Sequence, residues 1–239
     1  MAKINAATLR SLLLGALGIA LAACGANSAI ATTTAGSPTS SGAILFQGNF
    51  SDPAQQWPTS SDPNKSESAN DDTYSVQLNA PGSLDATPVI TTVQPQDLAN
   101  VSVSVSTKPT GVRPGDRFGI LCRSIAGHAY AFSVGPRSPG QLAWSIQLRR
   151  SQGVRQLASG TTPVPTTSPY DVRGDCIQGG QDHKPVVLAL YLGGKLVGQA
   201  QDSKLPAPYV GQPGLSVGSA GGGTRVDFSN FQVRAASAS

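Results

Sequence analysis

The segment NVSVSVS, residues 100–106, alternates strictly between small polar and branched apolar side chains. Because successive side chains of a β-strand point to opposite faces, Val101, Val103 and Val105 share one face of this segment. The same two-residue period runs through DRFGILCR (116–123), HAYAFSV (128–134) and QLAWSIQLR (141–149). No convincing amphipathic helix follows residue 24. The sequence therefore predicts an all-β fold.

Three further segments indicate how the strands are joined. PVVLALYL (185–192) is apolar throughout, which is typical of a central strand that is covered on both faces. Gly193-Gly194 follows it and predicts a tight hairpin, since glycine adopts positive φ without steric cost. In TRVDFSNFQVR (224–234) the apolar period slips by one residue, which predicts a β-bulge. Many short strands separated by turn residues indicate a β-sandwich.

The first 23 residues have the pattern of an export signal. Lys3 and Arg10 make a basic start, and residues 12–23 form an apolar run that is too short to span a bilayer. The following LAAC (21–24) resembles the bacterial lipobox. The resemblance implies that Cys24 is diacylated and anchors the mature chain in the cell membrane, on its extracytoplasmic face. The alternative is an ordinary signal peptide in which Cys24 is incidental.

The composition divides the rest of the chain into a tether and one domain. Residues 24–42 carry no charge, no aromatic residue and little apolar content, so they are predicted to form a flexible tether. Their many Thr and Ser residues would also suit O-glycosylation. A single folded domain is expected over 43–235, followed by a disordered tail at 236–239.

The two remaining cysteines are predicted to form one structural disulfide. Disulfides persist in the compartment that an exported protein enters, and Cys122 and Cys176 are the only candidates after Cys24. The chain-entropy estimate for a loop of this length is roughly 4 kcal/mol of stabilisation. A redox or nucleophilic cysteine is the less favoured alternative. No metal site is predicted, because the chain has no C-x-x-C motif and its two histidines, His128 and His183, lie apart.

The charge balance excludes one class of partner. Without Lys3 and Arg10 the chain has fifteen basic and thirteen acidic residues. Arg149-Arg150 is the only adjacent basic pair, so no polybasic patch indicates nucleic acid as a partner.

Several short motifs occur in an order that is similar to that of a known family. ILFQGNFSDPAQQWP opens the domain, DRFGILCRS and HAYAFSV follow, VLALYLGGKLVGQAQ comes next, and GQPGLSV and VDFSNFQV close it. This order resembles the concanavalin A-like jelly roll, in the branch that includes laminin-G-like and 3-keto-disaccharide-hydrolase-like domains of bacterial surface proteins. The resemblance covers nearly all of 43–234. It implies a jelly-roll β-sandwich of two antiparallel sheets, with Trp57 packed in the core.

The carboxylates argue against the catalysis that this fold supports elsewhere. Retaining glycosidases of this fold use two acidic residues at E-x-D-x-x-E spacing. This chain has a single glutamate, Glu67, in the polar segment PTSSDPNKSESANDD, where a loop is expected. No catalytic residue and no cofactor are predicted. Non-catalytic binding is the leading function, and an enzyme that lacks the usual motif is the least favoured one.

Carbohydrate is the favoured ligand by a small margin over an envelope protein partner or a sensor role. The candidate ligand-binding residues are Arg123, Tyr130, Trp144 and Gln147. Tyr130 and Trp144 share strand faces with apolar neighbours, so core packing is the stronger interpretation for both. Arg123 follows Cys122 and should point to the opposite face, toward the surface or a groove. Gln147 would hydrogen-bond to sugar hydroxyls.

Overall fold

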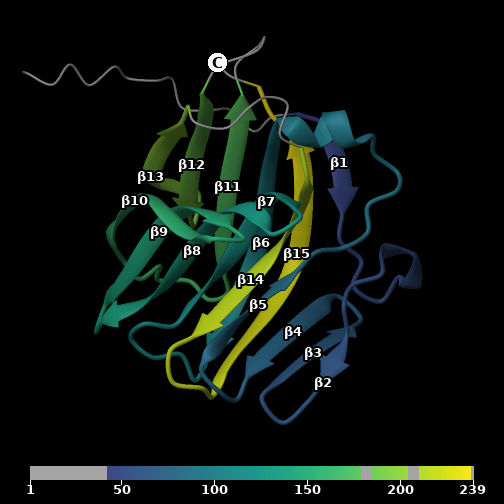
Figure 1. Ribbon diagram of the computed structural model, residues 1–239. Coiled ribbons are helices and arrows are strands. Elements are labelled where there is room, and N and C mark those ends of the chain that lie inside the picture. The colour runs from purple at the N-terminus through teal and green to yellow at the C-terminus, as the bar shows by residue number, and fades with distance from the viewer. Residues whose placement is uncertain (1–41, 179–184, 204–209, 238–239) are drawn as a thin grey trace, which may run out of the picture. The chain divides into compact units, whose positions relative to one another are not determined.

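The alternating segments form β-strands in two antiparallel sheets, which Figure 1 shows as two layers. The computed structural model describes residues 42–178, 185–203 and 210–237. Within these ranges the only helices are two short 3₁₀ segments, η1 (Pro53–Gln55) and η2 (Pro95–Ala99). The predicted all-β sandwich of two antiparallel sheets is therefore confirmed.

The larger sheet has nine strands in the order β13-β12-β11-β6-β15-β4-β3-β2, and β1 pairs with β15 beside this path. Its strands are β1 (Ile44–Gln47), β2 (Ser60–Ser61), β3 (Lys65–Asn70), β4 (Thr73–Leu78), β6 (Val101–Thr110), β11 (Tyr170–Gln178), β12 (Val186–Leu192), β13 (Lys195–Asp202) and β15 (Thr224–Ala235). Neighbours such as β6 and β15 are far apart in the sequence. Such crossovers are typical of a jelly roll.

The smaller sheet has six strands in the order β10-β9-β8-β7-β14-β5. They are β5 (Gly82–Ala86), β7 (Arg117–Ile125), β8 (His128–Ser138), β9 (Gln141–Arg150), β10 (Gly153–Pro163) and β14 (Gln212–Ser219). Four of them, β7 to β10, follow one another as a meander. The sheet is completed by strands from distant parts of the chain.

The core lies between the two sheets and uses the faces that the alternation predicts. Val101, Val103 and Val105 of β6 are buried against residues such as Phe118 and Phe132 of the smaller sheet. At one end, four aromatic rings pack on one another with centroids 4.8 to 5.7 Å apart, in stacked, tilted and edge-to-face pairs. These rings belong to Phe50, Trp57, Tyr74 and Phe231. Trp57 is therefore a core residue, as the family resemblance implied.

The predicted turn and bulge are both present. Gly193 and Gly194 have φ of 55° and 77° and connect β12 to β13 as a two-residue hairpin. The pairing of β15 with β6 shifts register between Ser229 and Gln232, and Asn230 within the shift has φ of 55°. Both features follow from local sequence, because they depend on residues that tolerate positive φ.

The disulfide between Cys122 and Cys176 is present and joins the two sheets. Cys122 lies in β7 of the smaller sheet and Cys176 in β11 of the larger one, and both are fully buried. The bond therefore crosses the core and does not link neighbouring strands of one sheet.

The expectation that Glu67 lies in a loop is wrong. Glu67 lies in β3, and its carboxylate accepts hydrogen bonds from the hydroxyls of Ser60 and Tyr74 at 2.9 and 2.7 Å. The polar composition of this segment misled the prediction, because β3 lies near the edge of the sheet and most of its side chains face solvent. Glu67 is nevertheless buried beside the aromatic cluster.

The export signal, Cys24 and the tether up to residue 41 lie outside the described residues. In the described part of the chain no helix is long and apolar enough to cross a membrane. At the other end, the amide of Ala236, the first residue of the predicted tail, donates a hydrogen bond to the carbonyl of Asn100 at 3.0 Å.

Candidate functional site

The smaller sheet curves strongly toward its outer face. Arg149 of β9 and Asp85 of β5 form an ion pair on this face, with Nη1 and Oδ1 2.6 Å apart. Three strands, β8, β7 and β14, lie between β9 and β5. In a flat sheet these four strand spacings would separate the backbones by about 19 Å, which is too far for the two side chains to meet. The outer face of this sheet is therefore concave.

Glycines in the middle of the sheet allow the strands to approach one another closely. A Cβ atom at Gly119 of β7 would overlap the carbonyl oxygen of Phe132, and one at Gly135 of β8 would overlap that of Asp116. Both positions must remain without a side chain, as is typical where backbones come into close contact. The floor of the concave face is consequently low at its centre.

Hydroxyl groups line the floor beside these glycines. The strand registers place Ser216, Gly119, Ser133, Ser145 and Ser159 on one row across five strands. The hydroxyls of Ser133 and Ser145 lie 2.8 Å apart and share a hydrogen bond. A row of hydroxyls presents both donors and acceptors, and it can therefore pair with a ligand that carries hydroxyl groups.

Two neighbouring hollows lie on the concave face. One has a volume of about 420 Å³ and lies over β7 to β10, and the other, of about 530 Å³, extends toward β5 and the β9–β10 turn. Arg117 and Gln147 line both hollows, so we treat the two as lobes of a single site and call it the concave groove. The side chain of Arg117 lies across the sheet against Gly218.

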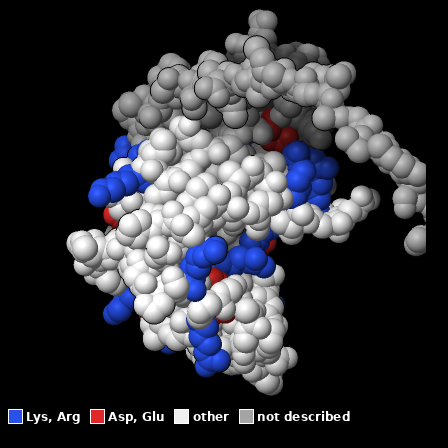
Figure 2. All heavy atoms as spheres, turned by 90° about the vertical axis from the view of Figure 1, so that its left-hand side faces the viewer, with Lys and Arg blue, Asp and Glu red and all other residues white. Residues whose placement is uncertain are grey.

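Arginine is the charged residue that dominates the concave groove. Arg117 and Arg137 line the first lobe, and Arg117, Arg149 and Arg150 line the second. Figure 2 shows the face on the β10 and β13 side of the molecule, where Lys and Arg side chains stand out in groups on a mostly uncharged surface with few acidic groups. The groove is thus a polar, basic site.

Asp116 fixes the loop at the end of the first lobe. Its carboxylate accepts hydrogen bonds from the amides of Arg113 and Ala220 at 2.8 Å each, and from the hydroxyls of Thr224 at 2.6 Å and Ser219 at 3.3 Å. Burial by itself would raise the pKa of Asp116, but these hydrogen bonds to the charged form outweigh it and hold the pKa below its ordinary value. Asp116 therefore stays ionised as a structural anchor.

The expectation that Arg123 faces the surface or a groove is wrong. Arg123 is fully buried, and it donates hydrogen bonds to the carbonyl oxygen of Ala99 in η2 and, at 3.2 Å, to Oε1 of Gln178. The reason is a register shift in the β7–β8 pairing after Cys122, where Arg123 adopts φ of 54°. This bulge reverses the alternation and turns the side chain inward.

Tyr130 is also buried, as the stronger interpretation expected. Its ring lies in the core, and its hydroxyl donates to Oδ2 of Asp202 at 3.1 Å. Arg155 of β10 pairs with the other carboxylate oxygen of Asp202 at 2.6 Å. Burial, together with the charge of Asp202, raises the pKa of Tyr130. Tyr130 helps to join the sheets and does not line the groove.

Of Trp144 and Gln147, only Gln147 points to the outer face of the smaller sheet. The indole of Trp144 is half-buried and packs between Gly160 of β10 and Gly198 of β13 in the larger sheet, where no side chain would fit. Trp144 therefore shares the core-facing side of β9 with Ile146, as the stronger interpretation expected. Gln147 is 8% exposed and lines both lobes. Gln147 therefore remains the candidate for ligand contact.

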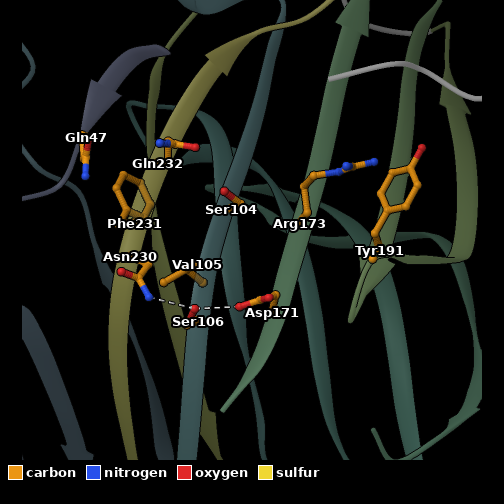
Figure 3. Close-up of a pocket in the computed structure, with 11 residues that line it drawn as sticks. Gln47, Ser104, Val105, Ser106, Asp171, Arg173, Tyr191, Asn230, Phe231 and Gln232 are labelled. Atoms are coloured by element: carbon orange, nitrogen blue, oxygen red, sulfur yellow. Dashed lines mark hydrogen bonds between the residues drawn. The ribbon is translucent and has the colours of Figure 1, made fainter. Parts of the chain in front are cut away.

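Apart from the concave groove, another hollow of about 460 Å³ lies on the outer face of the larger sheet (Figure 3). Its polar side chains contact one another: Ser106 donates to Asp171 at 2.6 Å, and Asn230 donates to Ser106 at 3.3 Å. The guanidinium of Arg173 lies 3.6 Å from the centroid of the Tyr191 ring. These interactions tie the lining of this hollow together.

Sequence reasoning missed Arg117, Arg137 and the serine row. Alternation does place Ser133 and Ser145 opposite the core face, but it cannot show that their strands are neighbours in register. Among the described residues no three His, Cys, Asp or Glu side chains gather in an arrangement that could hold a metal ion.

No protein-family model and no curated protein matches the sequence. Solved structures do share the fold. A protein of unknown function with a galectin-like fold from Bacillus subtilis has a TM-score of 0.51 at 13% identity, covering 84% of this chain and 99% of that one. The fold is a galectin-like jelly roll.

Two further solved structures share this sandwich at similar identity and TM-score. LamAcat from Zobellia galactanivorans matches with a TM-score of 0.50 at 12% identity, covering 80% of this chain and 97% of that one. A xylan β-1,4-xylosidase from Bacillus halodurans matches with a TM-score of 0.52 at 14% identity, covering 79% of this chain but only 38% of the xylosidase. At these identities the matches establish the jelly-roll architecture.

Proposed function

We propose that this chain is an exported lipoprotein whose jelly-roll domain binds carbohydrate in the concave groove without catalysing a reaction. The observation that carries the proposal is the groove itself: a curved sheet with a low floor that carries hydroxyl groups and is flanked by Gln147. Sugars are recognised in large part by hydrogen bonds to their hydroxyl groups. The groove supplies donors and acceptors for such bonds.

The fold is consistent with this proposal. The structures that share it include a xylosidase named for a polysaccharide, xylan. The carboxylates that line the groove, Asp85 and Asp116, already pair with Arg149 and with four hydrogen-bond donors, respectively. In these roles they are structural groups, which favours binding over catalysis.

The direct test is binding of the full chain, purified in detergent, to an array of envelope and plant polysaccharides. We expect Gln147→Ala to reduce binding at least tenfold, because a hydrogen-bonding group would be lost from both lobes. The matched control is Gln232→Ala, which removes the same side chain from β15 on the opposite sheet. Binding of no glycan at all would overturn the proposal, and capture of an envelope protein by the same surface would favour the protein-interaction alternative.

The anchoring part of the proposal needs its own experiment. Mass spectrometry of the exported chain should find a diacylglyceryl group joined to the sulfur of Cys24 by a thioether, and Cys24→Ala should move the protein from the membrane fraction to the soluble fraction. A Cys24→Ala chain that stays membrane-bound, or a native chain without acyl groups, would rule out the lipobox interpretation.

A further inference from the structure

We infer that the ligand of the concave groove is an acidic polysaccharide, one whose sugar units carry carboxylates. This inference rests on the proposed function and deepens it, because it names the chemical class of the glycan. It depends on which charges line the groove and which of them are already paired.

The lining has an excess of positive charge. Four guanidinium groups line the two lobes, those of Arg117, Arg137, Arg149 and Arg150, against two carboxylates, those of Asp85 and Asp116. Arginine side chains along a concave surface raise the local concentration of anions, since the low-dielectric walls focus the field. A neutral glycan would gain hydrogen bonds from these side chains but nothing from their charge.

Both carboxylates are engaged away from the remaining arginines. Asp85 pairs with Arg149 at 2.6 Å, and Asp116 is held by the loop amides and hydroxyls of its anchor. Among the described residues no carboxylate lies within ion-pair distance of Arg117, Arg137 or Arg150. Arg117, Arg137 and Arg150 therefore line the groove without an ion-pair partner among the described carboxylates.

The arrangement of these groups fits a sugar acid better than a bare anion. A guanidinium binds a carboxylate with two parallel hydrogen bonds, and it does so with defined geometry. Arg117 lies across the floor beside the serine row, and it lines the groove together with Gln147. A uronic acid unit presents a carboxylate and ring hydroxyls together, which matches arginine next to serine and glutamine.

The experiment compares each acidic polysaccharide with its neutral counterpart. Polygalacturonate, alginate and hyaluronate are each tested against the full chain in detergent, beside the same polymer after reduction of its carboxyl groups to alcohols. We expect at least one acid form to bind at least about tenfold more tightly than its reduced form, since charge-assisted hydrogen bonds contribute more than neutral ones. Binding should weaken as NaCl rises from 50 to 500 mM, because the charges are solvent-accessible.

Variants locate the effect in the groove. Arg117→Gln with Arg137→Gln should remove the preference for the acid form, whereas Arg117→Lys with Arg137→Lys should keep part of it. The control Arg225→Gln removes a 50% exposed arginine from β15 of the larger sheet and should change nothing. Unchanged circular dichroism and thermal midpoints are required of each variant, and the lysine pair provides the test if the glutamine pair fails to fold.

The outcomes separate this inference from the proposed function. Equal binding of acid and reduced forms would overturn the inference and leave carbohydrate binding intact. Equal binding of poly-glutamate would also overturn it, because the groove would then be a general surface for polyanions. Binding of neither acid nor neutral polysaccharides would overturn both proposals.

Discussion

At the residue scale, Arg123 shows how one backbone angle changes the role of a side chain. The bulge in β7 gives it φ of 54° and turns its guanidinium into the space beneath η2, where it bonds to Ala99 and Gln178. A buried arginine of this kind holds the end of the smaller sheet to the larger one. Its contribution is structural, although its place in the sequence suggested a surface residue.

Arg123→Ala should therefore destabilise the fold. The substitution leaves two part-buried acceptors without their donor and opens a cavity, which together cost about 2–4 kcal/mol in the free energy of unfolding. Urea denaturation of the two proteins measures the difference. Arg225→Ala, at an exposed ion pair, is the matched control and should change the free energy of unfolding by about 0.5 kcal/mol or less. A stable Arg123→Ala protein would show that the buried bonds contribute little.

The lowered pKa of Asp116 predicts how the stability of the fold depends on pH. Its pKa is lower in the folded chain than in the unfolded one, so the unfolded chain binds the proton first as the pH falls. The stability that Asp116 confers is complete above its ordinary pKa of about 3.9 and is lost as the pH falls through the lower folded value. Asp116→Asn should lower the thermal midpoint at pH 7 and have a much smaller effect near pH 2. Equal effects at both pH values would contradict the role of its charge.

At the scale of the strand, the alternation in the sequence was sufficient to find most elements. β6, β7, β8, β9 and the β12–β13 hairpin all lie where the two-residue period or the glycine pair indicates. Two features lay beyond this signal. The strand around Glu67 has little apolar content, and the bulge at Arg123 depends on pairing with β8, which no local pattern encodes.

The same limit applies to the concave groove. Its floor carries serines from β8, β9 and β10, so it exists only once the pairing and register of these strands are known. Gln147 could be selected from the sequence because it is a polar residue on a regular strand. Arg117 and Arg137 could not, since a single arginine at the end of a strand carries no signal of its own.

The curvature of the smaller sheet predicts the effect of adding one methyl group. Gly119→Ala places a Cβ against the carbonyl of Phe132 and should destabilise the fold by about 1–3 kcal/mol through strain. Gly221→Ala is the control, because its nearest atom would lie 3.9 Å away and its φ is not in the left-handed region. Thermal unfolding of both variants tests the difference. Equal midpoints would show that the sheet relaxes without loss.

At the scale of the whole molecule, the disulfide holds the sheets together through the core. Cys122 and Cys176 are 54 residues apart, and the bond restricts the unfolded chain over all of β8, β9, β10 and most of β11. Replacing both cysteines with alanine should cost about 2–5 kcal/mol in the free energy of unfolding. In the native protein, a thiol reagent should label Cys122 and Cys176 only after reduction. Labelling without reduction would contradict the bond.

The pairing of β1 with β15 has a practical consequence for how the domain is held. Ile44 lies opposite Arg234, so the first and last strands are neighbours, and both belong to the larger sheet (Figure 1). The concave groove is on the outer face of the other sheet. A linker fused to either end of the domain is therefore attached at the larger sheet, away from the concave groove. A domain immobilised in this way on a sensor chip would present its groove outward to the solution.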